Sequence, residues 1–345
     1  MSSRTNEWLP TTLSFSSGGV RTLAHMGVLM RLIEHRITTS VRAWHGCSGG
    51  SFCAFLGALG VSSAWIQDCT KVFDTRPLLT PQVLDFLEKW GLSSGLELTE
   101  YLGKFIDTWE PGASSWTFAD LQRERPGIFL GITAVNLNQR KLVQFSVDTH
   151  PTMLILDAIR ASSSIPFIYS PWIDASGEIF CDGALIEQAP WFHIQDRKGT
   201  LVVACDRSQV MGVSKKGTSI ETFFEYCSRI LLLQRKRLVA ERPRFWIATN
   251  NKTVASLNFE ASLEDRQQLF TEGAAAATAW IRFKHFAART GEIPPDSVGR
   301  NTLSVKNPSV EPESGNPQFG IQPPDPVASQ DLHTRRIRTS RRWSV

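Results

Sequence analysis

Short apolar runs alternate with longer amphipathic stretches over the first 290 residues of the chain. The short runs are rich in aliphatic and aromatic side chains over a few positions, which is typical of buried β-strands. We expect strands at 13–16, 43–47, 128–136, 142–146, 178–181, 201–206 and 244–249. The longer stretches repeat apolar residues every three to four positions, as the buried face of an α-helix does. We expect helices at 21–35, 49–59, 64–73, 81–90, 98–109, 154–163, 220–239 and 263–288.

The order of these elements predicts the fold class. In the helix expected at 21–35, Leu23, Met26, Met30 and Ile33 fall on one face. Strands that alternate with such helices favour a parallel sheet, because a parallel connection needs a crossover that a helix supplies. The sequence therefore predicts an α/β protein, a three-layer α/β/α arrangement in which helices cover both faces of a largely parallel central sheet.

The composition changes near residue 290. Residues 291–345 hold eight of the 18 prolines of the chain and only two aromatic residues, Phe319 and Trp343. Such a segment cannot bury enough apolar surface to offset the entropy lost on ordering. We therefore expect an N-terminal extension at 1–10, one folded domain at 11–290, and a mostly disordered Pro/Ser/Arg-rich tail at 291–345.

Positive charge is concentrated in that tail. The chain carries a net charge of +4, and residues 332–345 contain five arginines and no acid, so the preceding residues sum to −1. A basic fold that binds nucleic acid is therefore not indicated. The arginine cluster is either a solvated tail or a segment attracted to anionic lipid headgroups.

The apolar segments, the N-terminus and the cysteines together indicate in which cellular compartment the protein is expected. The longest run of apolar residues and glycine, 52–61, is about half of the ~20 residues that a membrane span needs. The N-terminus lacks the pattern of a secretory signal. The six cysteines are scattered, with no C-x-x-C pair and no metal-ligand spacing. We expect a cytoplasmic protein with reduced thiols and no metal site.

Residues 46–50, GCSGG, match the pattern G-x-S-x-G. They follow an expected strand and open an expected helix. In that context the serine stands on a sharp turn, the nucleophile elbow, where glycines allow close backbone approach and the hydroxyl is exposed for attack. Ser48 is therefore the candidate nucleophile, and Gly46 and Gly50 support the turn.

A second glycine-containing turn, SSGGVR at 16–21, lies between the first expected strand and the first expected helix. Backbone N–H groups at a helix start lack intrahelical partners, and glycines leave them unobstructed, so they can hold an anion. In acyl transfer that anion is the oxyanion of a tetrahedral intermediate. A nucleotide-phosphate loop is the rival interpretation, but neither G-x-x-x-x-G-K-[ST] nor a complete G-x-G-x-x-G is present.

A serine nucleophile needs a base within hydrogen-bond reach. Asp182 follows the strand expected at 178–181 and precedes Gly183, a pairing that also occurs in plain turns. None of the seven histidines is well placed, although His193 follows in the order Ser…Asp…His of the α/β-hydrolases. His193 stays open as a base, and a Ser48–Asp182 dyad accounts better for the residues present.

These motifs, in this order, resemble those of the patatin-like phospholipases. Further matches are RTLAHMGVL at 21–29, TAVNLN at 133–138 and AIRASSSIP at 158–166. The resemblance covers about residues 11–280 and leaves the tail uncovered. It implies the fold of that family and hydrolysis of acyl-lipid esters by a Ser–Asp dyad, without a cofactor and with no metal in the chemistry.

Carried over to this chain, the resemblance implies Ser48 as the nucleophile and Asp182 as the base. It also implies that the N–H groups of Gly18, Gly19 and Val20 form the oxyanion hole.

The supporting residues implied in the same way are Arg21, which would brace the loop, and Gly183. The family loop usually reads G-G-G-x-[RK]-G, and this chain departs from it at Ser17 and Thr22. Serine adopts the left-handed backbone conformation far less readily than glycine, so position 17 bears on the geometry of the loop.

The implied partner is an acyl-lipid substrate, with transient peripheral membrane contact and no nucleic acid.

An aspartate with an ordinary pKa of ~3.9 is a poor base, so the dyad requires a partly dry pocket, which the apolar cleft for an acyl chain would supply. Two alternatives remain. One is a Ser-His-Asp α/β-hydrolase that uses His193 on soluble esters, and the other is a catalytically weak acyl-lipid-binding protein.

Overall fold

The structure is a computed structural model that describes residues 8–82, 86–205, 245–249 and 254–290. The helix expected at 220–239 and the tail expected at 291–345 lie outside the described residues. No helix within the described part has the length and apolar character needed to cross a membrane.

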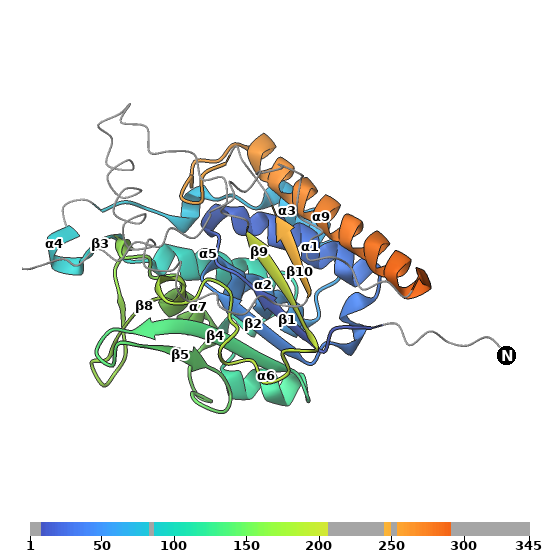
Figure 1. Cartoon of the computed structure of the whole chain (residues 1–345). Helices are drawn as coiled ribbons and strands as arrows, with labels where there is room; N and C mark the ends of the chain where they lie inside the picture. Colours follow the sequence, from blue (N-terminus) through green and yellow to red (C-terminus); the bar gives the residue numbers. More distant parts are fainter. Residues whose placement is uncertain (1–7, 83–85, 206–244, 250–253, 291–345) are drawn as a thin grey trace, which may run out of the picture. The chain divides into compact units, whose positions relative to one another are not determined.

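An eight-stranded sheet lies at the centre of the described part (Figure 1). Its strand order is β10-β9-β1-β2-β4-β8-β7, and β5 pairs with β4 outside this path. The first five strands of this order run parallel, whereas β5, β8 and β7 are antiparallel to their neighbours. The strands are β1 (Thr12–Phe15), β2 (Ala43–Cys47), β4 (Phe129–Asn136), β5 (Lys141–Phe145), β7 (Trp172–Ile173), β8 (Ile179–Asp182), β9 (Thr200–Cys205) and β10 (Phe245–Thr249).

Helices flank this sheet, and its mostly parallel strands confirm the predicted α/β fold class. The α2 helix packs on β2, α7 packs on β4 and β8, and α1 lies beside α9 near β9 and β10 (Figure 1). A side chain at Gly27 of α1 or Gly273 of α9 would overlap the backbone of the other helix, so these glycines permit the close packing. The helices are α1 (Leu23–Glu34), α2 (Gly49–Leu59), α3 (Ser63–Val72), α4 (Phe86–Lys89), α5 (Leu96–Asp107), α6 (Phe118–Glu124), α7 (Ile155–Ser162) and α9 (Leu263–Thr290).

Local sequence signals fail at the helix expected at 81–90. Pro81 and Gln82 are not helical, and the Gln82 N–H donates to the Leu92 carbonyl instead of starting a helix. The described helix in this region, α4, is much shorter. The strands β3 (Gly91–Ser93) and β6 (Phe167–Tyr169) form a separate two-stranded parallel sheet that the sequence pattern did not predict.

One edge of β4 aligns β2 and β8 end to end. The last residue of β2, Cys47, pairs in parallel with Thr133, and the next β4 residue, Ala134, pairs in antiparallel fashion with Asp182 of β8. The strand β5 pairs with residues 132–136 of β4 and so takes the opposite edge. The C-terminal ends of β2 and β8 therefore meet, although they lie far apart in the sequence.

Candidate active site

Ser48 occupies a sharp turn between β2 and α2. Its φ of 54° and ψ of −133° lie in a region that residues other than glycine rarely enter. A side chain at Gly46 would overlap the backbone of Ser51, and one at Gly50 would overlap the Phe15 carbonyl. Glycine at both positions lets α2 begin directly against the ends of β1 and β2, as an elbow requires.

Ser48 and Asp182 are brought together where β2 and β8 end. Ser48 Oγ donates a hydrogen bond of 2.7 Å to Asp182 Oδ2, and Asp182 Oδ1 accepts the Ala184 N–H at 2.8 Å. Only 3% of Ser48 and 4% of Asp182 are exposed. Gly183 has no room for a side chain, because a Cβ there would overlap the Thr133 carbonyl oxygen. A buried hydroxyl that donates to an oriented carboxylate is a geometry suited to proton abstraction.

The described histidines do not hydrogen-bond to the Ser48 hydroxyl. His193 lies exposed on the loop at 186–199. Burial, with a smaller electrostatic effect of His193, lowers the pKa of His45 to about 4. His25 is fully buried, its Nε2 lies 3.4 Å from Cys205 Sγ, and burial lowers its pKa to about 3. The structure therefore gives no geometric support to a histidine base within the described residues.

The glycine loop that follows β1 borders the elbow. A Cβ on Gly49, the first residue of α2, would lie 3.2 Å from the Gly19 carbonyl oxygen. The left-handed residue of the loop is Gly19, with a φ of 57°, and Ser17 has no positive φ. Serine at position 17 therefore carries no left-handed strain. Thr22, the other departure from the family pattern, donates from Oγ1 to the Gly19 carbonyl at 2.6 Å.

The three N–H groups predicted to form the oxyanion hole differ in their partners. The Val20 N–H donates to the Ser256 carbonyl at 2.9 Å and is therefore engaged in this structure. Within the described residues, no hydrogen bond is found for the N–H of Gly18 or of Gly19. Arg21 ties the loop to the same neighbouring segment, because its Nε donates to the Val254 carbonyl at 2.8 Å.

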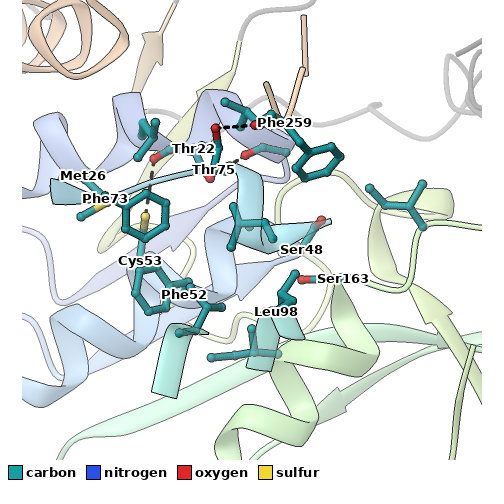
Figure 2. Close-up of a pocket in the computed structure, with 18 of the residues that line it drawn as sticks. Thr22, Met26, Ser48, Phe52, Cys53, Phe73, Thr75, Leu98, Ser163 and Phe259 are labelled. Carbon is teal, nitrogen blue, oxygen red and sulfur yellow. Dashed lines mark hydrogen bonds between the residues drawn. The ribbon is translucent and has the colours of Figure 1, made fainter. Parts of the chain in front are cut away.

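Ser48 lines a mostly apolar cavity of about 70 Å³ (Figure 2). The rings of Phe52 and Phe73 lie on one side of it, and Ser48 and Ser163 lie on the other. The elements that contribute the lining are the glycine loop, α1, α2, α5, α7, the segment that follows α3, and the segments around β6 and Phe259. The lining residues are Gly19, Val20, Thr22, Leu23, Met26, Ser48, Gly49, Phe52, Cys53, Phe73, Thr75, Leu78, Leu98, Leu102, Ile159, Ser163, Ile165, Tyr169 and Phe259.

Two residues of the AIRASSSIP run at 158–166, Ser162 and Arg160, make hydrogen bonds that support the site. Ser162 Oγ accepts the Ser48 N–H at 2.8 Å. Arg160 is buried, and its guanidinium donates to the Ser94 carbonyl at 3.1 Å and the Ser170 carbonyl at 2.6 Å. Burial lowers the pKa of Arg160 to about 10. A polar residue at a helix end has many structural uses, so its sequence position alone did not reveal these contacts.

A buried carboxyl, that of Glu187, lies five residues after Asp182 in the sequence. Glu187 is 8% exposed, and its Oε1 accepts the N–H groups of Trp191 at 2.9 Å and Phe192 at 3.0 Å. No hydrogen-bond partner is found for its Oε2 within the described residues. Burial raises the pKa of Glu187 to about 7, against the opposing effect of the two backbone donors. The Glu187 carbonyl also lies 3.4 Å from Sγ of Cys47, the residue before Ser48.

The mostly parallel sheet and the strand-to-helix turn at Ser48 are features of α/β hydrolytic enzymes. The family model of the patatin-like phospholipases matches residues 13–193, more than half of the chain and the part that holds Ser48 and Asp182. The chain therefore belongs to the patatin-like phospholipase family and is a carboxylic ester hydrolase.

Individual proteins are also similar to this chain. The uncharacterized protein R571 of Acanthamoeba polyphaga mimivirus is 24% identical over 277 residues, which cover 76% of this chain and 90% of the viral one. The probable lipid hydrolase 463L of Invertebrate iridescent virus 6 is 28% identical over 184 residues, 52% of this chain and 61% of its own. Among solved structures, VipD from Legionella pneumophila shares the fold, with a TM-score of 0.51 at 16% identity over 80% of this chain and 67% of VipD.

Proposed function

We propose that this chain hydrolyses carboxylic esters of acyl lipids through a Ser48–Asp182 dyad and an acyl-enzyme. The observation that carries the proposal is the 2.7 Å hydrogen bond from Ser48 Oγ to Asp182 Oδ2, next to a mostly apolar cavity. Asp182 takes the hydroxyl proton as Ser48 Oγ attacks the ester carbonyl, and then passes it to the departing alcohol oxygen. In the second step Asp182 takes a proton from water, whose oxygen attacks the acyl carbon. The bond between the acyl carbon and Ser48 Oγ then breaks, Asp182 returns the proton to Ser48 Oγ, and the carboxylic acid leaves.

The oxyanion of each tetrahedral intermediate requires backbone donors. We assign this role to Gly18 and Gly19, whose N–H groups have no hydrogen bond within the described residues. The N–H of Gly49 at the start of α2 is a third candidate, because the residue after the nucleophile commonly supplies such a donor. Val20 can contribute only when the Ser256 carbonyl moves away. One donor of this kind is typically worth about 3 kcal/mol of transition-state stabilisation.

The cavity favours an acyl chain over a polar acyl group. Its lining includes the aromatic rings of Phe52, Phe73 and Phe259 and the aliphatic side chains of Leu98 and Leu102. An acyl chain gains about 0.8 kcal/mol for each methylene group transferred from water into such surroundings. An acyl chain that enters the cavity comes from a lipid in a membrane. The proposal therefore includes transient peripheral contact between the protein and membranes.

Covalent labelling with a fluorophosphonate tests the nucleophile. Wild-type protein should be labelled, and Ser48→Ala should not be. Asp182→Asn preserves the size of the side chain and should slow both labelling and short-ester hydrolysis by at least about 100-fold, the lower range for general-base catalysis. Near-normal hydrolysis by folded Asp182→Asn would refute the assignment of the base.

One further variant and two measurements separate the alternatives. Replacement of His193 by alanine should leave hydrolysis nearly unchanged, because the described structure places no hydrogen bond between His193 and Ser48; a large loss would support a Ser-His-Asp triad. A well-folded wild-type protein that binds a fatty acid yet resists labelling would support the lipid-binding alternative. Profiling the products released from phospholipid vesicles by wild type and by Ser48→Ala identifies the bond that is cleaved.

A further inference from the structure

The end of α7 contacts the backbone of both members of the dyad. The Ser48 N–H donates to Ser162 Oγ at 2.8 Å, and the Ser162 hydroxyl in turn donates to the Thr133 carbonyl at 2.6 Å. Two residues later, the Ser164 carbonyl accepts the Asp182 N–H at 2.9 Å. One short segment thus connects the nucleophile turn to β4 and also holds the residue that ends β8.

The turn at Ser48 needs such support. A residue with a side chain at a φ of 54° and a ψ of −133° is strained, and strained residues persist only where the surrounding structure fixes them. Ser162 is fully buried, so bulk water cannot take the place of its hydroxyl as the acceptor of the Ser48 N–H. Without that hydroxyl, the Ser48 N–H would lose its acceptor in a dry environment, which is a costly state for a backbone donor.

We infer that Ser162 is a positioning residue that holds Ser48 in the conformation from which its hydroxyl attacks. The inference rests on the proposed role of Ser48 as the nucleophile. Ser162 does not line the cavity, whereas the next residue, Ser163, does. Loss of the Ser162 hydroxyl should therefore slow the chemical step and leave substrate binding nearly unchanged.

The magnitude follows from the sensitivity of chemistry to distance. A displacement of 1 Å of a reacting group costs about 100-fold in rate. A turn released from one hydrogen bond moves by a fraction of that distance, so we expect Ser162→Ala to lower kcat by about tenfold or more.

Ser14 offers a matched control. Like Ser162 it is fully buried, and its hydroxyl donates to one backbone carbonyl, that of Pro190, at 2.7 Å. It lies on β1 and hydrogen-bonds to neither Ser48 nor Asp182. Replacement by alanine therefore removes a comparable buried hydroxyl and should lower thermal stability to a similar extent, without disturbing the elbow.

The experiment measures three quantities for the full-length wild type, Ser162→Ala and Ser14→Ala: kcat and KM on a short soluble ester, the rate of fluorophosphonate labelling, and the midpoint of thermal unfolding. We expect kcat and the labelling rate of Ser162→Ala to fall by about tenfold or more with little change in KM. Ser14→Ala should keep both rates. Equal losses in the two variants would overturn the inference, as would a folded Ser162→Ala labelled as fast as wild type.

A second variant covers the case in which Ser162→Ala does not fold. Ser162→Cys fills the same space, but its thiol is a weak acceptor and a weak donor. It should show a reduced labelling rate at an unchanged KM, and an unchanged rate would overturn the inference. Failure of the wild type itself to be labelled would instead refute the proposed function, so the two failures are distinguishable.

Discussion

Glu187 should make stability fall as pH rises through the neutral range. Burial raises its pKa from 4.5 to about 7. Between these two pKa values the folded protein keeps a proton that the unfolded chain has released. The free energy of unfolding contributed by this residue therefore decreases from about pH 4.5 to about pH 7 and stays low above that range.

The size of this effect follows from the two pKa values. They differ by about 2.5, and at about 1.36 kcal/mol for each pKa unit the ionised carboxylate costs about 3 kcal/mol of stability above neutral pH. The change Glu187→Gln removes the titration and keeps an oxygen that can accept the N–H groups of Trp191 and Phe192. The glutamine variant should therefore be more stable than wild type at pH 8, by up to about 3 kcal/mol, and nearly equal to it at pH 5.

Urea unfolding at several pH values between 5 and 8 measures this difference, provided that the slope with denaturant is the same for both proteins. An exposed residue on α5 supplies the control, because Glu100→Gln removes the same charge at the surface. Because Glu100 is exposed, its replacement should change the free energy of unfolding by at most about 0.5 kcal/mol. A constant difference between Glu187→Gln and wild type from pH 5 to pH 8 would show that the carboxyl does not titrate there and would refute the reasoning.

Two further predictions concern Gly183 and the tail. Gly183→Ala should lower the free energy of unfolding by about 1–3 kcal/mol and reduce ester hydrolysis, because its Cβ would overlap the Thr133 carbonyl and push Asp182 away from Ser48. Thermal unfolding and a short-ester assay measure both effects, and a fully active, equally stable variant would contradict the geometry. Deletion of 291–345 should spare hydrolysis of a short soluble ester; a collapse of that activity would show that this segment belongs to the folded unit.

Local signals in the sequence predict the nucleophile turn well. The apolar run before Ser48 and the helical run after it give β2 and α2 with the bounds expected, because strand, glycine turn and helix are adjacent in the chain. The same kind of signal fails at Pro81. The residues next to Pro81 favour the start of a helix, but Gln82 instead donates a hydrogen bond to Leu92, which lies in a strand ten residues away.

The contacts that complete the site are not encoded at neighbouring positions. The sequence points to Asp182 because it ends a predicted strand and matches the family motif, but the antiparallel pairing of β8 with β4 that brings it to Ser48 leaves no pattern in either segment. The sequence also does not indicate the hydrogen bond between Ser162 and Ser48, because a serine at a helix end usually hydrogen-bonds only to nearby backbone groups. The engagement of Val20 by Ser256 likewise depends on a segment more than 200 residues distant.

Because β2 and β8 pair with the same edge of β4, the distance between Ser48 and Asp182 depends on the register in which β8 pairs with β4. A slip of β8 by one residue would carry Asp182 about 3.4 Å along β4 and turn its side chain to the opposite face of the sheet. Insertions and deletions within these strands should therefore be strongly selected against. Length changes between α3 and α5 leave this register unchanged, so evolution can reshape the cavity wall there while Ser48 and Asp182 stay in contact.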